Sequence, residues 1–436
     1  MIGKLIVASI LTGIISGFFI TLYELLITFV SEVLFFGNPY ESISTLPVWY
    51  IYLVPTVSIF IVNYLVVKDK NIKEYGVSEI ADSIIQNKMS IRIKTLFWKI
   101  VSSTLSLSSG FMVGTEGPSA GIGAMIATHI HRWFNLPVMM IKMMISIGAS
   151  SGIAAIFVSP LTGISFAIEN IAYQFVKQYI GHLILASVIA FSISIHYLQP
   201  IIFKHSLGRV FDNDYILANI LFIPFITSFV YLYLFLKKRV LLYIDLEIFD
   251  KVSKYRNHIF ALIGGVVVGT ILLIEPHAAF SGKAIVTHLI NQNTSIPLYF
   301  IFLIIILRII GTTVSIYANA IGGIFLPLMS IGALVGYAYG ELLGNYAGFP
   351  IEPFYFAAIG AAVFMGVIMK LPLTAVVLAV ETTFDYNIVV ATGISVVLVS
   401  YLSSFYFDIK RMYATKIDTL YIIKKIKKRV IDDNSL

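Results

Sequence analysis

Long apolar runs recur along nearly the whole chain, and they limit its folds more than any other feature of the sequence. Most of them approach the ~20 residues that an α-helix needs to cross the core of a bilayer. They are continuous, whereas the strands of a membrane β-barrel show short stretches of alternating hydrophobicity. Only 12% of the 436 residues are charged, against about 25% in a soluble domain. The sequence therefore predicts an all-α integral membrane protein with many helices.

The apolar runs end at glycine, proline or charged residues, which mark the expected helix boundaries. We expect helices at about 4–30, 46–67, 95–113, 179–198, 213–236, 259–274, 297–316, 321–342, 354–380 and 387–406, and three pieces within 117–174, broken at Asn135-Leu136-Pro137 and Ser159-Pro160. A helix at about 78–86 would be too short to span the membrane. The first run is too long for the apolar part of a signal peptide, so we expect it to be retained.

The net charge of +7 is concentrated in connecting segments and near the C-terminus. In a membrane protein such charge indicates topology, because cytoplasmic loops carry the excess of lysine and arginine. We therefore place the loop around Lys237 and the short basic tail 421–436 in the cytoplasm of a protein of the cell membrane. The tail is too short to be a folded domain, and we expect no nucleic-acid partner.

The sequence offers little for a metal, a cofactor or a nucleotide. It contains no cysteine, which excludes disulfides, iron–sulfur ligands and thiol nucleophiles. His129 and His131 are two residues apart and would point to different faces of a helix, and there is no His-Glu-x-x-His motif. A phosphate-binding loop of the Walker type is also missing, so ATP-driven transport is not supported. We expect no cofactor.

An internal repeat divides the chain into two halves. The block Gly148 to Asn170 aligns without gaps on Gly360 to Thr382, 212 positions later, with eight of 23 pairs identical. A second block, Gly114 to Ala124, matches Gly323 to Ala333 at an offset of 209, with five of 11 pairs identical. Two blocks at nearly one offset indicate a duplicated membrane domain. Duplicated halves with apolar segments broken at matching positions are typical of transporters, although the sequence leaves open whether the halves are parallel or inverted.

Glu116 is the most unusual residue of the repeat. It lies in Gly114-Thr-Glu-Gly-Pro118, inside otherwise apolar sequence, and Pro118 suits the first turn of a helix. Glu116 would thus lie at a helix N-terminus, where backbone N–H groups and the helix dipole favour an anion. Because an ionisable group inside a membrane domain is by default a functional residue, we interpret Glu116 as a tethered anion that competes with a diffusible one. Its partner in the repeat is Phe325.

These motifs together resemble the CLC family of chloride channels and anion/proton antiporters. The resemblance is carried by Gly114–Pro118, by Gly323-Ile-Phe-Leu-Pro327, by the two Pro-Leu-Thr blocks and by Tyr413. It implies a membrane domain over residues 1–420 with many tilted and broken helices in two inverted repeats, at about 1–205 and 210–415. It also implies a homodimer with a pore in each subunit and bound chloride ions. No cytoplasmic regulatory domain pair is expected here.

Carried over position by position, the resemblance assigns Glu116 as the gating and proton-accepting glutamate. The backbone at Gly117, Ile324 and Phe325 would face the anion, and the hydroxyl of Tyr413 would contact it. The segment Tyr75, Gly76 and Val77 would supply further contacts to the anion. The protein is then expected to carry chloride through the bilayer in exchange for protons.

Two departures from the family pattern keep alternatives open. Tyr75 stands where the family usually has an anion-contacting serine or another selectivity residue, so the choice among chloride, nitrate and fluoride is open. Antiporters of the family typically carry two adjacent glutamates where this chain has Glu169-Asn170, the second of which relays internal protons. Asn170 cannot accept a proton, which makes a passive channel, gated by voltage or pH and without proton coupling, the alternative.

Two other features favour less specific interpretations. Glu169 and Glu381 occupy the same place in both repeats, which favours a structural role such as accepting buried backbone N–H groups. Gly148-Ala-Ser150-Ser151-Gly152 fits the Gly-x-Ser-x-Gly pattern of serine hydrolases, but that pattern needs a preceding strand and a helix is expected here. We therefore expect no enzyme activity.

Overall fold

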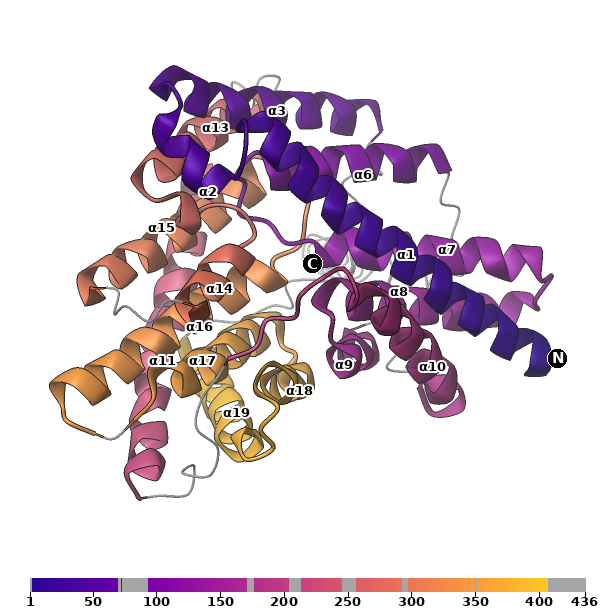
Figure 1. The fold of residues 1–436 in the computed structure, drawn as a ribbon. Helices are drawn as coiled ribbons and strands as arrows, with labels where there is room; N and C mark the ends of the chain where they lie inside the picture. The colour runs from indigo at the N-terminus through magenta and orange to yellow at the C-terminus, as the bar shows by residue number, and fades with distance from the viewer. Residues whose placement is uncertain are drawn as a thin grey trace, which may run out of the picture.

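The computed structural model describes residues 2–69, 72, 93–170, 176–203, 213–244, 256–291, 297–349 and 351–406, and the elements within them are helices (Figure 1). They are α1 (Ile2–Leu34), α2 (Pro39–Ser42), α3 (Val48–Lys68), α6 (Ile93–Ser108), α7 (Glu116–Trp133), α8 (Ile141–Phe157), α9 (Pro160–Asn170), α10 (Val176–Ser194), α11 (Asn213–Ile244), α13 (Arg256–Ile274), α14 (Lys283–Asn291), α15 (Leu298–Tyr317), α16 (Phe325–Glu341), α17 (Pro353–Met369), α18 (Pro372–Thr383) and α19 (Ile388–Tyr406). Short helical turns at Ile43–Thr45, Val138–Met140, Pro276–Ala278 and Leu342–Tyr346 connect some of them.

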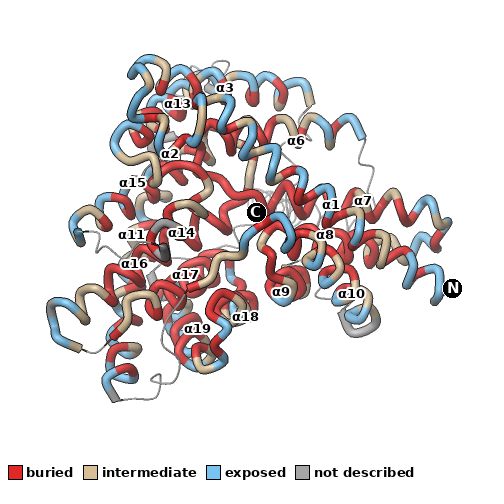
Figure 2. Tube along the Cα trace, viewed as in Figure 1, coloured by how far each residue is buried: buried red, intermediate tan, exposed pale blue. Residues whose placement is uncertain are grey.

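Within this described part of the chain, seven helical segments are long and apolar enough to cross a membrane. Their outward sides carry large apolar residues, among them Phe18 and Phe29 on α1 and Trp49 on α3, each more than half exposed. In a bilayer these side chains would face lipid, where apolar exposure has no cost. The central helices are different, because α8, α16 and α17 are buried along most of their length (Figure 2). The molecule thus has a protein core with lipid-facing helices around it.

Two matching helix pairs form the centre of each half. Helices α7 and α8 cross where a Cβ on Gly123 would overlap the backbone carbonyl of Gly148, and one on Gly148 would overlap that of Gly123. Helices α16 and α17 cross in the same way at Gly332 and Gly360. Small residues allow such close approach between membrane helices. The repeat seen in the sequence therefore marks the same tight crossing twice.

Corners of the chain also repeat. Helix α8 ends at Val158 with φ of 52°, and α17 ends at Lys370 with φ of 57°. Gly110 and Asn319, one repeat apart, likewise have positive φ values of 101° and 64°. Left-handed backbone is unfavourable for a residue with a Cβ, and most of all for valine.

The structure differs from the expected boundaries in several places. Lys237, expected in a loop, lies within α11, which continues to Ile244. The run 354–380 is two helices, because the chain turns at Lys370 before Pro372 starts α18. Helix α7 begins at Glu116 itself, two residues before Pro118. The nine-residue helix α14 was not predicted at all. The short helix expected at about 78–86 lies outside the described residues.

Candidate functional site

The two repeat motifs meet directly in space. Gly114 N donates to Gly323 O and Gly323 N donates to Gly114 O, each at 2.7 Å, as an isolated antiparallel bridge. Such a reciprocal pair is what a local twofold relation between the two segments requires. It brings the start of α7 against the start of α16. The N-termini of both helices, which favour negative charge, therefore converge on one point.

Glu116 lies at this point and is completely buried. Its Oε1 accepts a hydrogen bond of 2.5 Å from the backbone N–H of Phe325, the first residue of α16. Its Oε2 is buried as well and has no hydrogen-bond partner in the described part of the chain. By the bond from Phe325 N–H, the carboxylate binds the helix start of the other repeat. It is held by one oxygen only.

The flanking glycines give the carboxylate its space. A Cβ on Gly114 or on Gly323 would overlap the Glu116 carboxylate, so neither position can carry a side chain without moving it. A Cβ on Gly117 would meet its nearest neighbour, Gly323 N, at 3.5 Å, which is an ordinary contact. Glycine is therefore required where the backbone contacts the carboxylate, at Gly114 and Gly323, and not at Gly117.

Phe325 contributes its backbone N–H to the site and its ring to the packing beneath it. The ring centroid lies 4.4 Å from that of Phe157 and 6.0 Å from that of Phe166, and Phe325 is completely buried. Ile324 precedes it as the N-cap residue of α16. Aromatic contacts at these distances hold the ring in place. The direction of the amide follows from its position as the first residue of α16.

A cleft lies beside this site. It is lined by residues that flank both helix starts, by the ends of α8 and α18, and by three charged side chains; the lining includes Glu24, Thr115, Phe157, Lys283, Leu326 and Glu381. Thr115 directly precedes Glu116, and Leu326 directly follows Phe325. A small solute in the cleft would therefore approach the carboxylate and the amide that binds it.

Glu169 and Glu381 form a second, reciprocal exchange between the halves. Glu169 accepts hydrogen bonds at the start of α18 from Leu373 N, Thr374 N and Thr374 Oγ1, at 2.8, 2.8 and 2.6 Å. Glu381 accepts at the start of α9 from Leu161 N, Thr162 N and Thr162 Oγ1, at 2.8, 2.7 and 2.7 Å, and also from Ser159 Oγ. The structural role expected for these two glutamates is confirmed.

The structure brings together four of the residues expected in the site: Glu116, Gly117, Ile324 and Phe325. Tyr75, Gly76, Val77 and Tyr413 lie outside the described residues. Asn170 is the last residue of α9, and its Nδ2 is buried with no hydrogen-bond partner among the described residues.

The hydrolase pattern forms no catalytic arrangement. Ser150 Oγ donates to Gly163 O at 3.2 Å and lies 2.7 Å from Ser187 Oγ, and Ser151 Oγ donates to Ile147 O at 2.7 Å. Both serines lie on α8 and are completely buried. Their recorded partners are backbone carbonyls and another serine, which supply no general base.

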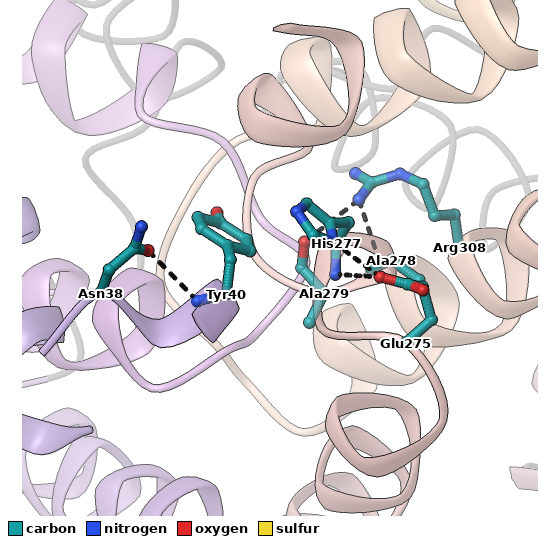
Figure 3. Close-up of polar contacts among 7 residues, drawn as sticks. All are labelled: Asn38, Tyr40, Glu275, His277, Ala278, Ala279 and Arg308. Carbon is teal, nitrogen blue, oxygen red and sulfur yellow. Dashed lines mark hydrogen bonds and ion pairs between the residues drawn. The ribbon is translucent and has the colours of Figure 1, made fainter. Parts of the chain in front are cut away.

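Sequence reasoning missed Arg308, a fully buried cation on α15 (Figure 3). Its guanidinium donates to the carbonyls of Ala278, Ala279 and Ser281. A single arginine inside the apolar run 297–316 was the signal, because a charge in such a run needs partners. Those partners belong to a connecting segment that carries no motif.

The family model described as "Voltage gated chloride channel" matches residues 56–404. The H(+)/Cl(-) exchange transporter ClcA of Vibrio campbellii is 26% identical over 422 residues, which cover 90% of this chain and 85% of that protein. ClcA of Klebsiella pneumoniae is 26% identical over 324 residues, covering 70% of this chain and 65% of the relative.

Two solved structures share the fold. A slow cyanobacterial Cl−/H+ antiporter superimposes with a TM-score of 0.81 at 21% identity and covers 98% of both chains. A CLC-type fluoride/proton antiporter gives a TM-score of 0.74 at 20% identity and covers 93% of this chain and 96% of its own. Together with the seven membrane-length helices, these matches confirm an all-α, multi-pass integral membrane protein.

Proposed function

Since this chain belongs to the voltage-gated chloride channel family, we propose that it carries chloride or a similar small anion across the membrane in exchange for protons. Glu116 is the gate in this proposal. The relatives in curated collections and solved structures are described as proton-coupled exchangers, which supports this class of activity.

The observation that carries the proposal is the bond from Phe325 N–H to Glu116 Oε1. A helix start buried in a membrane protein is a site for an anion, and here a side-chain carboxylate takes that place. When Glu116 accepts a proton it loses its negative charge, and its hydrogen bond from Phe325 N–H loses about half of its strength. A diffusible anion from the cleft then replaces it at the amide. The ionised carboxylate of Glu116 and the diffusible anion are in this way alternative occupants of one site, and proton uptake by Glu116 favours the anion.

Other parts of the site follow from the same proposal. Bound chloride ions would lie at the N-terminus of α16, near the amides of Ile324 and Phe325. Tyr75, Gly76, Val77 and Tyr413 would complete the path for the anion. The protein would act as a homodimer with one path in each subunit.

A passive chloride channel is the second candidate, and Asn170 is the observation that favours it. Asn170 stands where the resemblance places an internal proton-relaying glutamate, and an amide does not titrate. In an exchanger, protons would have to reach Glu116 by another route, such as a chain of water molecules. In a channel, Glu116 would open and close the path without a net movement of protons.

The experiment is a paired flux measurement in liposomes. Purified protein is reconstituted, a chloride gradient is imposed, and chloride efflux and internal pH are recorded together. We expect chloride to drive protons against their gradient, and Glu116→Gln to abolish the proton movement while anion flux continues. Glu32→Gln, at an exposed position on α1, is the matched control and should behave as the wild type.

Each result decides between the candidates. Anion flux without proton movement in the wild type would exclude the exchanger and leave the channel. No anion flux from folded, monodisperse protein would contradict both.

A further inference from the structure

Three charged side chains line the cleft beside Glu116: Lys283, Glu24 and Glu381. Lys283, the first residue of α14, and Glu24, on α1, both line it, and Lys283 Nζ lies 3.9 Å from Glu24 Oε1. Their side chains are 30% and 18% exposed, so neither is sealed from solvent. Glu381 is bound to the start of α9, and the rest of the lining is uncharged. Lys283 is thus the cationic side chain among the residues that line this cleft.

The pair is loose. A separation of 3.9 Å is longer than a hydrogen bond, so the ammonium and the carboxylate attract each other electrostatically but form no hydrogen bond at this distance. Oε2 of Glu24 is buried and has no hydrogen-bond partner in the described part of the chain. An anion entering the cleft would therefore find an ammonium group with N–H donors to offer and a carboxylate that is not firmly attached to it.

The loop 275–282, which directly precedes Lys283, is held in place by Arg308 on α15. Arg308 Nη1 donates to Ala278 O at 3.0 Å and to Ala279 O at 3.2 Å (Figure 3). Its Nη2 donates to Ser281 O at 3.1 Å. Gly282 has a φ of 96°, and a Cβ there would overlap the guanidinium. Arg308 is therefore a positioning residue that sets the residue directly before Lys283.

The other end of the same loop is fixed from α2. Oε1 of Glu275 accepts from His277 N at 2.9 Å and lies 2.7 Å from His277 Nδ1. The His277 ring stacks on Tyr40, with centroids 4.9 Å apart and planes 18° apart (Figure 3). Tyr40 N in turn donates to the side chain of Asn38. With both ends held, the loop presents Lys283 to the cleft in a defined position.

We propose that Lys283 is a capture site for small monovalent anions at the entrance to the gate, and that Glu24 is its internal competitor. This inference rests on the proposed anion transport and adds a step before it. An arriving anion replaces Glu24 beside the ammonium, and the carboxylate returns when the anion moves on to the amide of Phe325. A fixed cation in a low-dielectric cleft raises the local anion concentration and speeds entry. Glu24 limits the residence time, so the anion is not trapped.

The absence of cysteine makes a direct test feasible. In Lys283→Cys the only thiol lies at the position of interest, and thiosulfonate reagents that cannot cross the bilayer attach a charge of chosen sign to those molecules whose cleft faces outward. The initial rate of chloride uptake is measured against external chloride. We expect the KM for chloride to rise roughly fivefold on removal of the cation, as one unit charge near a protein surface would give, with little change in the maximal rate.

Reagents of opposite sign then separate charge from shape. A trimethylammonium-bearing reagent should return the KM towards the wild-type value, and a sulfonate-bearing reagent of similar size should raise it further. Glu24→Gln should lower the KM, because the competitor is gone. Raising the ionic strength with an impermeant salt should reduce these differences. Lys4→Gln, at the opposite end of the helix that carries Glu24, and the unmodified cysteine-free protein treated with each reagent are the controls.

The outcomes distinguish this inference from the proposal on which it rests. An unchanged KM in Lys283→Cys, or equal effects of the two reagents, overturns the capture site while transport and coupling stand. A lower maximal rate with an unchanged KM means that the position only supports the loop, and it also overturns the inference. If the wild type carries no anion, the proposed function itself fails.

Discussion

Three glutamates in this molecule accept hydrogen bonds from a helix start in the other half of the chain, but they are held very differently. Glu169 and Glu381 use both carboxylate oxygens, and each accepts from at least three donors. Glu116 uses one oxygen and one donor, and its second oxygen has no partner among the described residues. The same contact thus occurs in a saturated form and in a form that can be released.

In the proposed function only one of these contacts acts as a gate, and the repeat offers a reason. Glu169 of the first half binds the start of α18, and Glu381 of the second half binds the start of α9. Each half thus holds a helix of the other. Phe325 stands where a carboxylate matching Glu116 would be, so the start of α7 receives no equivalent group from the second half. The two halves thus hold each other symmetrically at α9 and α18, and this symmetry is lost at α7 and α16, where only Glu116 supplies a carboxylate.

The largest expected effect is a difference in stability between a variant at Glu381 and a variant at Glu116. Glu381→Ala leaves two backbone N–H groups and two hydroxyls without their acceptor, and we expect a loss of about 3 kcal/mol of stability. Glu116→Ala leaves one N–H and should change stability by about 1 kcal/mol or less. Thermal unfolding in detergent, followed by size-exclusion chromatography, measures both. Similar shifts in the two variants would show that Glu116 is as much a fastening as Glu381.

A smaller effect should come from the glycines around the gate. In Gly323→Ala the new methyl group overlaps the Glu116 carboxylate and displaces it from the amide of Phe325. We expect proton coupling to fall severalfold and stability to drop by about 1–3 kcal/mol from overpacking. Gly117→Ala is the matched control, since its methyl meets only an ordinary contact at 3.5 Å. The ratio of protons to chloride moved in liposomes gives the readout, and equal ratios in both variants would contradict this account of the gate.

The smallest effect should appear at the repeated corners. Lys370→Gly removes a Cβ from left-handed backbone at an exposed position, and we expect a gain of about 0.5–1 kcal/mol. Val158→Gly relieves the same strain but also removes a buried side chain, so its net gain should be smaller. Unfolding temperatures of the two variants measure the difference. A destabilised Lys370→Gly would mean that its side chain has a structural role at that corner.

The sequence was sufficient for the features that repetition or composition reveals. Apolar runs predicted the helices, and the shared Pro-Leu-Thr blocks placed Glu169 and Glu381 in equivalent structural positions. Glu116 was expected at a helix mouth, and it lies there. These predictions succeeded because hydrophobic periodicity and helix-start chemistry are local properties of the chain.

The pairings across the two halves could not be predicted. Local reasoning gave Glu116 the N–H groups of its own helix, whereas it accepts from Phe325, 209 residues away. The turn at Lys370 was missed although Pro372, which aligns with Pro160 in the repeat, is a residue that favours a helix start. Arg308 and Lys283 act through a loop whose position depends on carbonyls that have no sequence signature. Each of these contacts is decided by tertiary packing.

The reciprocal contacts of Glu169 and Glu381 also constrain the order in which the chain can complete its hydrogen bonds during synthesis. The N–H groups of Leu161 and Thr162 at the start of α9 wait for Glu381, about 220 residues later in the chain. At ~5–20 residues per second, the ribosome needs roughly 10 to 40 s to deliver that acceptor. Backbone groups without a partner are costly within lipid. The first half must therefore stay incomplete, or borrow water, lipid headgroups or the insertion machinery, until the second half has entered the membrane.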